Sequence, residues 1–173
     1  MGSLPEIVEL ATCGPDETRH LGSAIGRTAR PGDVLLLVGE LGAGKTTLTQ
    51  GIARGLGVKE HAVSPSFVLM REYKGRLPLY HLDLYRLERL AEIADLGLDD
   101  YLCGKGVSIV EWADRGPSLM PADHLMIELR ALSGSERCIR LIPHGERYRQ
   151  RLKDIVSQTE AARWNCRSTP RPK

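Results

Sequence analysis

The sequence has no long apolar run, no paired cysteines and no internal repeat, and each absence narrows the possible classes of protein. No apolar stretch approaches the roughly 18 residues that a membrane-spanning helix needs, and no basic-plus-apolar signal peptide opens the chain. The four cysteines are scattered without a C-x-x-C pair, so neither a disulfide framework nor a zinc site is expected. These absences favour a protein of the reducing cytoplasm that has no membrane contact.

The composition is that of one ordinary globular domain, but its charge is uneven. The 173 residues are 42% apolar and 27% charged, enough to bury a core. Residues 146–173 hold eight Lys or Arg against three Asp or Glu, although the whole chain carries only +2. We therefore expect a domain over 1–145 and a basic helix and tail over 146–173, partly disordered. A solvated extension is the favoured interpretation, and contact with RNA phosphates or an acidic partner is the alternative.

A glycine-rich segment is the most informative feature that is present. Residues 39–46 match the phosphate-loop pattern G-x-x-x-x-G-K-[ST] at every fixed position. The apolar run 34–38 before them is typical of a strand that is buried on both faces in a parallel sheet. After them Leu48, Ile52 and Leu56 recur every four residues, as on one face of a helix. Strand, loop and helix therefore follow in the order that a phosphate-binding loop requires.

Each residue of this loop has a physical role in the predicted nucleotide site. The glycines allow consecutive backbone N–H groups to turn toward phosphate oxygens, at the positive end of the following helix. Lys45 would bridge the β- and γ-phosphates, the hydroxyl of Thr46 would bind Mg²⁺, and Thr47 would lie near the α-phosphate. No N-K-x-D motif for reading guanine occurs, which favours ATP over GTP. The predicted nucleotide-binding residues are Gly39, Glu40, Leu41, Gly42, Ala43, Gly44, Lys45, Thr46 and Thr47.

The remaining patterns predict an α/β phosphate-loop NTPase. It would be a three-layer sandwich with a mixed, mainly parallel central sheet and a β-hairpin after the phosphate-loop helix. In the predicted hairpin His81, Asp83 and Tyr85 share one face of the second strand. We expect helices over 16–30, 87–96 and 98–102, hairpin strands over 66–73 and 77–87, and strands over 106–112, 124–129 and 137–141.

Two acids are candidates for the metal and for hydrolysis. Glu111 ends a predicted buried strand, where ligands of open α/β sheets bind, and could hold Mg²⁺ directly or through water. Asp83 lies among apolar and aromatic neighbours, where a bare carboxylate is costly. For Asp83 a functional role and a local pair with Arg86 are equally supported. His81 is interpreted mainly as a hydrogen-bonded structural residue rather than as a base.

Two further segments near these acids carry open interpretations. Residues 64–67, Ser-Pro-Ser-Phe, lie where phosphate-loop proteins often place a loop that senses the γ-phosphate, and a simple turn into a strand is equally possible. Trp112 is interpreted as a packing residue or an interface anchor rather than as a residue that stacks on the nucleotide.

Four motifs in order resemble the TsaE (formerly YjeE) family of bacterial tRNA threonylcarbamoyladenosine biosynthesis ATPases. They are the loop Gly-Glu-Leu-Gly-Ala-Gly-Lys-Thr-Thr at 39–47, Ser-Pro-Ser-Phe at 64–67, His-Leu-Asp-Leu-Tyr-Arg-Leu at 81–87 and Val-Glu-Trp at 110–112. The resemblance covers about residues 12–142 and is far more specific than any single motif. The basic tail lies outside it and inherits nothing from it.

The resemblance implies a small ATPase that works with the TsaB and TsaD proteins. Together they would place threonylcarbamoyl on the adenosine beside the anticodon of tRNA, which this chain would meet only through the complex. It further implies that the loop binds ATP with Lys45 as a catalytic residue, that Thr46 binds Mg²⁺, and that Asp83 and Glu111 serve both the metal and hydrolysis.

Two other functions remain as alternatives. A small-metabolite kinase would suit the length and the loop, but such kinases usually carry an arginine-bearing lid, and no compact arginine cluster follows the loop helix in the body of the chain. A nucleotide-gated interaction module, in which turnover is incidental, is the second. The body also offers no obvious arginine finger near the loop, so we expect a partner to complete the site.

Overall fold

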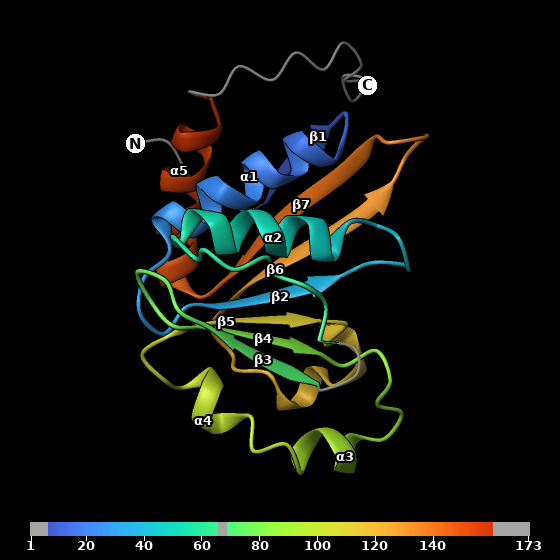
Figure 1. Ribbon diagram of the computed structural model, residues 1–173, viewed down its shortest axis with the longest axis vertical. Helices are drawn as coiled ribbons and strands as arrows, with labels where there is room; N and C mark the ends of the chain where they lie inside the picture. The colour runs from blue at the N-terminus through green and yellow to red at the C-terminus, as the bar shows by residue number, and fades with distance from the viewer. Residues whose placement is uncertain (1–6, 66–68, 161–173) are drawn as a thin grey trace.

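A seven-stranded mixed sheet forms the centre of the computed structural model, which describes residues 7–65 and 69–160. The strands lie in the order β1-β7-β6-β2-β5-β4-β3 (Figure 1). The four central strands β6, β2, β5 and β4 are parallel, whereas β1, β7 and β3 join antiparallel at the two sides. The strands are β1 (Val8–Thr12), β2 (Val34–Val38), β3 (Met70–Tyr73), β4 (Leu79–Asp83), β5 (Val107–Glu111), β6 (His124–Ala131) and β7 (Arg137–His144).

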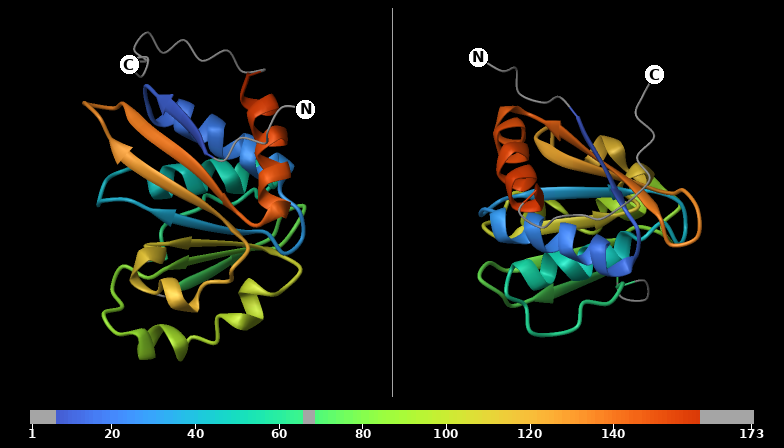
Figure 2. Two further views of the ribbon diagram at one scale, coloured as in Figure 1. Left: turned by 180° about the vertical axis from the view of Figure 1, so that it is seen from behind. Right: turned by 90° about the horizontal axis from the view of Figure 1, so that it is seen from above.

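Helices cover both faces of the sheet, which confirms the predicted three-layer arrangement (Figure 2). Side chains alternate along a strand, so β2 supplies both cores: Leu35 and Leu37 pack under α1, α2 and α5, while Val34 and Leu36 pack under α3 and α4. The helices are α1 (Pro15–Thr28), α2 (Lys45–Gly55), α3 (Leu90–Ala94), α4 (Asp99–Leu102) and α5 (Glu146–Glu160), with short 3-10 turns at Ala113–Arg115 and Pro117–Leu119.

The region after β4 differs from the sequence-based expectation. The strand predicted to run to Leu87 ends at Asp83, because the Asp83 carboxylate accepts the Tyr85 backbone N–H and the Leu87 N–H bonds to the Leu84 carbonyl, which together turn the chain. Tyr85 is therefore not on the strand and is 39% exposed. The helix that follows is α3, shorter than the predicted 87–96. Residues 66–68 of the predicted first hairpin strand lie outside the described residues.

The phosphate-loop helix α2 packs unusually close to α1. Glycines recur four residues apart in each helix, at Gly22 and Gly26 in α1 and at Gly51 and Gly55 in α2. A Cβ at any of the four would overlap a backbone carbonyl oxygen of the opposite helix. The two helices lie side by side in Figure 1. Because only glycine permits this approach, the pair fixes where α2, and with it Lys45, lies over the sheet.

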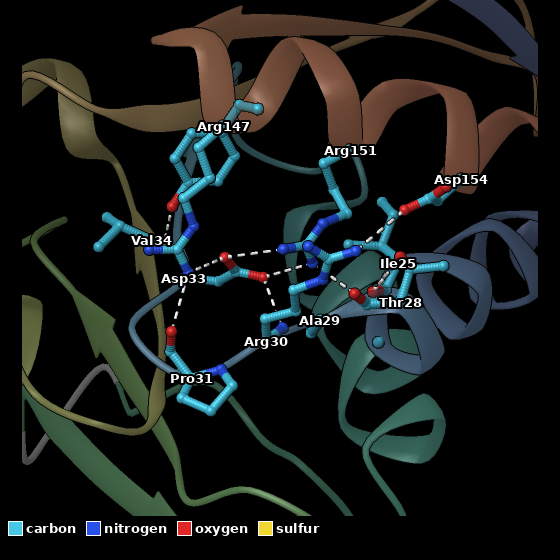
Figure 3. Close-up of polar contacts among 12 residues, drawn as sticks. Ile25, Thr28, Ala29, Arg30, Pro31, Asp33, Val34, Arg147, Arg151 and Asp154 are labelled. Atoms are coloured by element: carbon cyan, nitrogen blue, oxygen red, sulfur yellow. Dashed lines mark hydrogen bonds and ion pairs between the residues drawn. The ribbon is translucent and has the colours of Figure 1, made fainter.

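The C-terminal helix α5 packs against the domain, so the expected solvated extension is not found over residues 146–160, while residues 161–173 lie outside the described residues. Tyr148, Leu152 and Ile155 are buried against the core. Asp33, buried just before β2, accepts hydrogen bonds from Arg147 (2.6 Å), Arg151 (2.8 Å) and the Arg30 backbone N–H (2.7 Å) (Figure 3). Two of the arginines that make the sequence end look basic are thus paired with a buried carboxylate of the domain.

The stability of the domain should depend on pH through His124. This ring begins β6, stacks on His144 at 4.3 Å and donates to the Pro121 carbonyl. Burial lowers the pKa of His124, and His144 adds to the effect. The unfolded chain therefore binds the proton more readily, and stability should be lost as the pH falls below about 6.5. Melting curves of the wild type and of His124→Phe from pH 8 to 5 test this: the variant should fall less steeply, and equal slopes would contradict the assignment.

Two expectations drawn from absences have different outcomes. Within residues 7–65 and 69–160 the structure has no helix that is long and apolar enough to cross a membrane. Of the cysteines in that part of the chain, Cys103 and Cys138 are free thiols. Cys13 is disulfide-bonded, a single bond that the scattered spacing of the cysteines did not indicate.

Candidate nucleotide-binding site

The segment 39–44 joins the end of β2 to the first residue of α2, as the sequence predicts. Gly44 caps the helix with φ of +105°, a conformation that residues with a Cβ rarely adopt. A Cβ on Gly39 would overlap the Leu129 carbonyl oxygen of β6. The first N–H groups of α2 have no partner inside the helix, and they point out of its positive end into the loop. The backbone alone therefore makes an anion site here.

Lys45 is 5% exposed and folds back over the loop. Its ammonium group donates to the carbonyl oxygens of Gly39 (2.6 Å) and Glu40 (2.8 Å) and lies 3.8 Å from the centre of the Trp112 ring. Burial lowers the pKa of Lys45, while the nearby carboxylates of Glu111, Asp114 and Asp83 act to raise it. The cation is thus already aimed at the loop and would exchange carbonyl partners for phosphate oxygens.

Glu111 ends β5 beside the start of α2 and is 2% exposed. Thr46 Oγ1 lies 3.1 Å from Oε2 and 3.3 Å from Oε1. Thr49 Oγ1 and His81 Nε2 lie 3.2 Å and 2.8 Å from Oε1. A carboxylate and a threonine hydroxyl in contact are the oxygen ligands that suit Mg²⁺, which usually takes one or two carboxylates together with substrate phosphates.

Asp83 lies directly beside Glu111, because β4 and β5 pair in parallel with these two residues in register. Ser64 Oγ donates to its Oδ2 at 2.6 Å and the Tyr85 N–H donates to its Oδ1 at 2.9 Å. The carboxylate is held in one orientation by these contacts. Ser64 belongs to the segment 64–67, of which Ser66 and Phe67 lie outside the described residues, so the interpretation of that segment as a γ-phosphate sensor stays a prediction.

A cavity of about 370 Å³ brings the predicted residues together. It contains Lys45, Thr46, both acids and Trp112, so the predicted catalytic and metal-binding residues share one space. A larger cavity of about 540 Å³ lies between residues 39–41 and the strands β6 and β7. The lysine, the hydroxyl and the two acids that phosphate chemistry needs all line the smaller cavity. Its lining residues are Leu41, Gly42, Gly44, Lys45, Thr46, Thr47, Ser64, Asp83, Tyr85, Arg86, Glu111 and Trp112.

Arg137 and Thr49 near the loop were missed from the sequence, and Arg86 was considered only as a partner of Asp83. Arg137 on β7 donates to the Ala43 carbonyl at 3.1 Å and the Gly42 carbonyl at 3.3 Å, which braces the loop from outside. Arg86 lines the cavity. Two arginines therefore lie close to the loop, and the expectation that the body supplies no obvious arginine finger there stays a prediction. Thr49, one helical turn after Lys45, has the spacing of a second inward hydroxyl, which could have identified it.

Comparisons with known proteins give matches that span the segment holding this site. The family model of the threonylcarbamoyl adenosine biosynthesis protein TsaE matches residues 13–139. The chain is 43% identical over 145 residues to the tRNA threonylcarbamoyladenosine biosynthesis protein TsaE of Bacillus subtilis, covering 83% of this chain and 90% of that protein. The protein of that name from Treponema pallidum is 41% identical over 121 residues, covering 70% and 90%.

A solved structure is similar over nearly the whole fold. The crystal structure of Bacillus subtilis YdiB superposes with a TM-score of 0.79 at 38% sequence identity, covering 88% of this chain and 96% of that one. The matched family region contains the loop, both acids and Trp112, so the similarity includes the site as well as the scaffold.

Proposed function

This chain belongs to the TsaE family of tRNA threonylcarbamoyladenosine biosynthesis proteins, and from that premise we propose that it is a Mg²⁺-dependent ATPase of this tRNA modification. It would act in the cytoplasm in complex with TsaB and TsaD and would meet tRNA through that complex. One observation carries the proposal: Lys45, Thr46, Asp83 and Glu111 converge on one cavity at the positive end of α2.

The residues divide the work between binding and hydrolysis. The loop amides and Lys45 would neutralise the β- and γ-phosphates, and Thr46 and Glu111 would hold the metal. When bound, Mg²⁺ would draw negative charge from the phosphate oxygens as the terminal bond breaks. Asp83, oriented by Ser64 and the Tyr85 N–H, would position the attacking water or the metal's water shell. Trp112, packed against Tyr85 at 4.8 Å, would shield the lysine from solvent.

Replacing either acid with its amide should reduce turnover more than binding. Glu111→Gln and Asp83→Asn keep shape and remove charge, so each should lower ATP hydrolysis by at least about tenfold, the scale of a missing catalytic interaction. ATP affinity should change less, because the loop and Lys45 remain. Turnover and nucleotide titrations, both in the complete partner complex, give the two numbers. Undiminished hydrolysis by both variants would remove these acids from the mechanism.

The isolated chain should be a weak ATPase that partners activate. The cavity is open to solvent, Leu41 at the tip of the loop is 76% exposed, and Arg86 is on the surface, so a partner has room to cover the phosphates. A transition-state charge supplied by a partner can raise the rate by roughly a thousandfold or more. ATP hydrolysis by the chain alone, with TsaB and TsaD, and with tRNA added tests the proposal.

The three arms of that experiment also separate the alternatives. A rate that rises as the complex forms supports the proposed function. High hydrolysis by the chain alone, without response to TsaB and TsaD, would point to a self-sufficient enzyme. Complex formation that needs ATP but proceeds unchanged with a non-hydrolysable analogue would favour a nucleotide-gated interaction module.

A further inference from the structure

His81 makes a hydrogen bond that packing does not require. The ring lies on β4 and is fully buried, with Nε2 at 2.8 Å from Glu111 Oε1. Its other nitrogen, Nδ1, is buried without a hydrogen-bond partner among the described residues. An orphaned polar atom in a packed interior is costly, and a leucine would fill the same space without that cost. The hydrogen bond to Glu111 is the interaction that offsets this cost.

The direction of this bond follows from its partners. A carboxylate can only accept, so the proton of the shared bond belongs to His81 Nε2. Nδ1 has no hydrogen-bond partner among the described residues, so Nε2 is the nitrogen through which the ring bonds to the site. His81 is thus a fixed donor whose hydrogen bond is directed at one oxygen of one acid.

The two oxygens of Glu111 have different surroundings. Oε1 receives His81 from β4 and Thr49 from α2, and both of these side chains are fully buried. Oε2 is nearer to Thr46, which lines the cavity. One oxygen is therefore anchored from behind, and the other is left on the cavity side.

The ammonium group of Lys45 attracts Glu111 and so acts against this anchoring. Among the carboxylates that act on Lys45, Glu111 has the strongest electrostatic effect. A Glu111 side chain free to rotate would be drawn toward that ammonium group and would compete with phosphate for it. The hydrogen bonds on Oε1 hold the acid in place against this attraction.

We propose that His81 is a positioning residue for the metal site: it holds Glu111 Oε1 so that Oε2 stays beside Thr46, available to Mg²⁺. The proposal rests on the proposed function. It assigns to His81 no contact with the nucleotide and no proton transfer. Partners that orient a metal ligand in this way typically contribute about 10- to 100-fold to metal affinity or activity.

Two substitutions separate orientation from packing. His81→Leu fills the space without a donor, whereas His81→Gln can place an N–H near the position of Nε2. In His81→Leu the Mg²⁺ concentration at half-maximal turnover should rise by about tenfold or more, while ATP affinity measured without Mg²⁺ should stay near the wild-type value. His81→Gln should recover most of the loss. His124→Gln, which alters another buried histidine far from the cavity, is the matched control and should leave the Mg²⁺ dependence unchanged.

Two further measurements do not rely on turnover. The Mg²⁺-induced gain in ATP affinity should shrink in His81→Leu, and adding His81→Leu to Glu111→Gln should cause no further shrinkage if His81 acts through Glu111. In the nucleotide-free wild type, the His81 ring N–H should give a slowly exchanging NMR resonance that moves in Glu111→Gln. That signal tests the contact even if His81→Leu does not fold.

Each outcome decides for or against the proposal. Wild-type Mg²⁺ dependence in His81→Leu would overturn the proposal. Equal losses of turnover in His81→Leu and His81→Gln, without a change in Mg²⁺ dependence, would also overturn it, because that is the result expected of a packing role. Additive effects in the double variant, or a His81 ring resonance that does not move in Glu111→Gln, would also overturn the proposal. Failure of the proposed function would appear separately, as a wild type that does not hydrolyse ATP, while the binding and NMR measurements would still decide the role of His81.

Discussion

Lys45→Ala should abolish productive nucleotide binding and leave the fold intact. The ammonium group is the cation held over the loop, and with phosphate bound its hydrogen bonds would be charge-assisted on both sides. Losing about 3 kcal/mol of such contacts weakens ATP affinity by roughly 100-fold. Turnover should fall further, because a missing electrostatic donor at developing charge costs about 100- to 1,000-fold in rate.

Titration with a fluorescent ATP analogue and an ATPase assay in the partner complex provide the measurement. Lys59→Ala is the matched control, because it removes an exposed lysine just after α2 and should change neither quantity. Melting temperatures of both variants show whether the fold survives. ATP affinity and hydrolysis that stay at the wild-type level in Lys45→Ala would remove the basis for a phosphate-binding loop.

Asp33→Ala should be the most destabilising of the single substitutions considered for this domain. Asp33 and Arg151 have side chains only 3% and 4% exposed, and the Arg151 guanidinium also donates to the Thr28 carbonyl. Burial lowers the pKa of Arg151, and Asp33 is the main group that opposes the shift. Removing one partner of a buried ion pair typically costs about 3–5 kcal/mol. For a chain of this size that corresponds to a fall in melting temperature of roughly 6–20 °C.

Asp154→Ala on the same helix is the control for this prediction. It breaks the Arg30–Asp154 pair, whose side chains are 66% and 50% exposed, so it should cost at most about 1 kcal/mol. Chemical denaturation of the wild type and both variants gives the free energies of unfolding. Equal, small losses in the two variants would show that α5 is not anchored through Asp33.

The site was predictable where its residues are neighbours in the chain. The loop and the start of α2 are contiguous, so the glycine spacing, Lys45 and Thr46 could be assigned directly. The pairing of Asp83 with Glu111 depends on β4 lying next to β5, which strand patterns suggest but do not fix. Thr49 and Arg137 were not predicted, because their roles depend on distances between elements and not on any local motif.

The errors in predicting the fold from the sequence have the same physical origin. Counting charges made the C-terminal helix look solvated, since the carboxylate that pairs with two of its arginines lies 114 and 118 residues earlier in the chain. Strand β1 is a five-residue edge strand with mostly half-buried residues, too short and too weakly patterned to be recognised. The end of β4 was misplaced because a side-chain contact of Asp83, and not a breaker residue, turns the chain.

The glycines between α1 and α2 decide where this domain can be redesigned. Replacing helix glycines with alanine is a routine way to raise thermostability, because it restricts the unfolded chain. At Gly22, Gly26, Gly51 and Gly55 the same change would push the helices apart and displace the start of α2. In a randomised library, variants substituted at these positions would be the first to lose the fold. Gly14 is the better choice for an engineer: it caps α1, and a Cβ there meets no atom of the described chain within 4 Å, so serine or aspartate could be introduced as a helix cap.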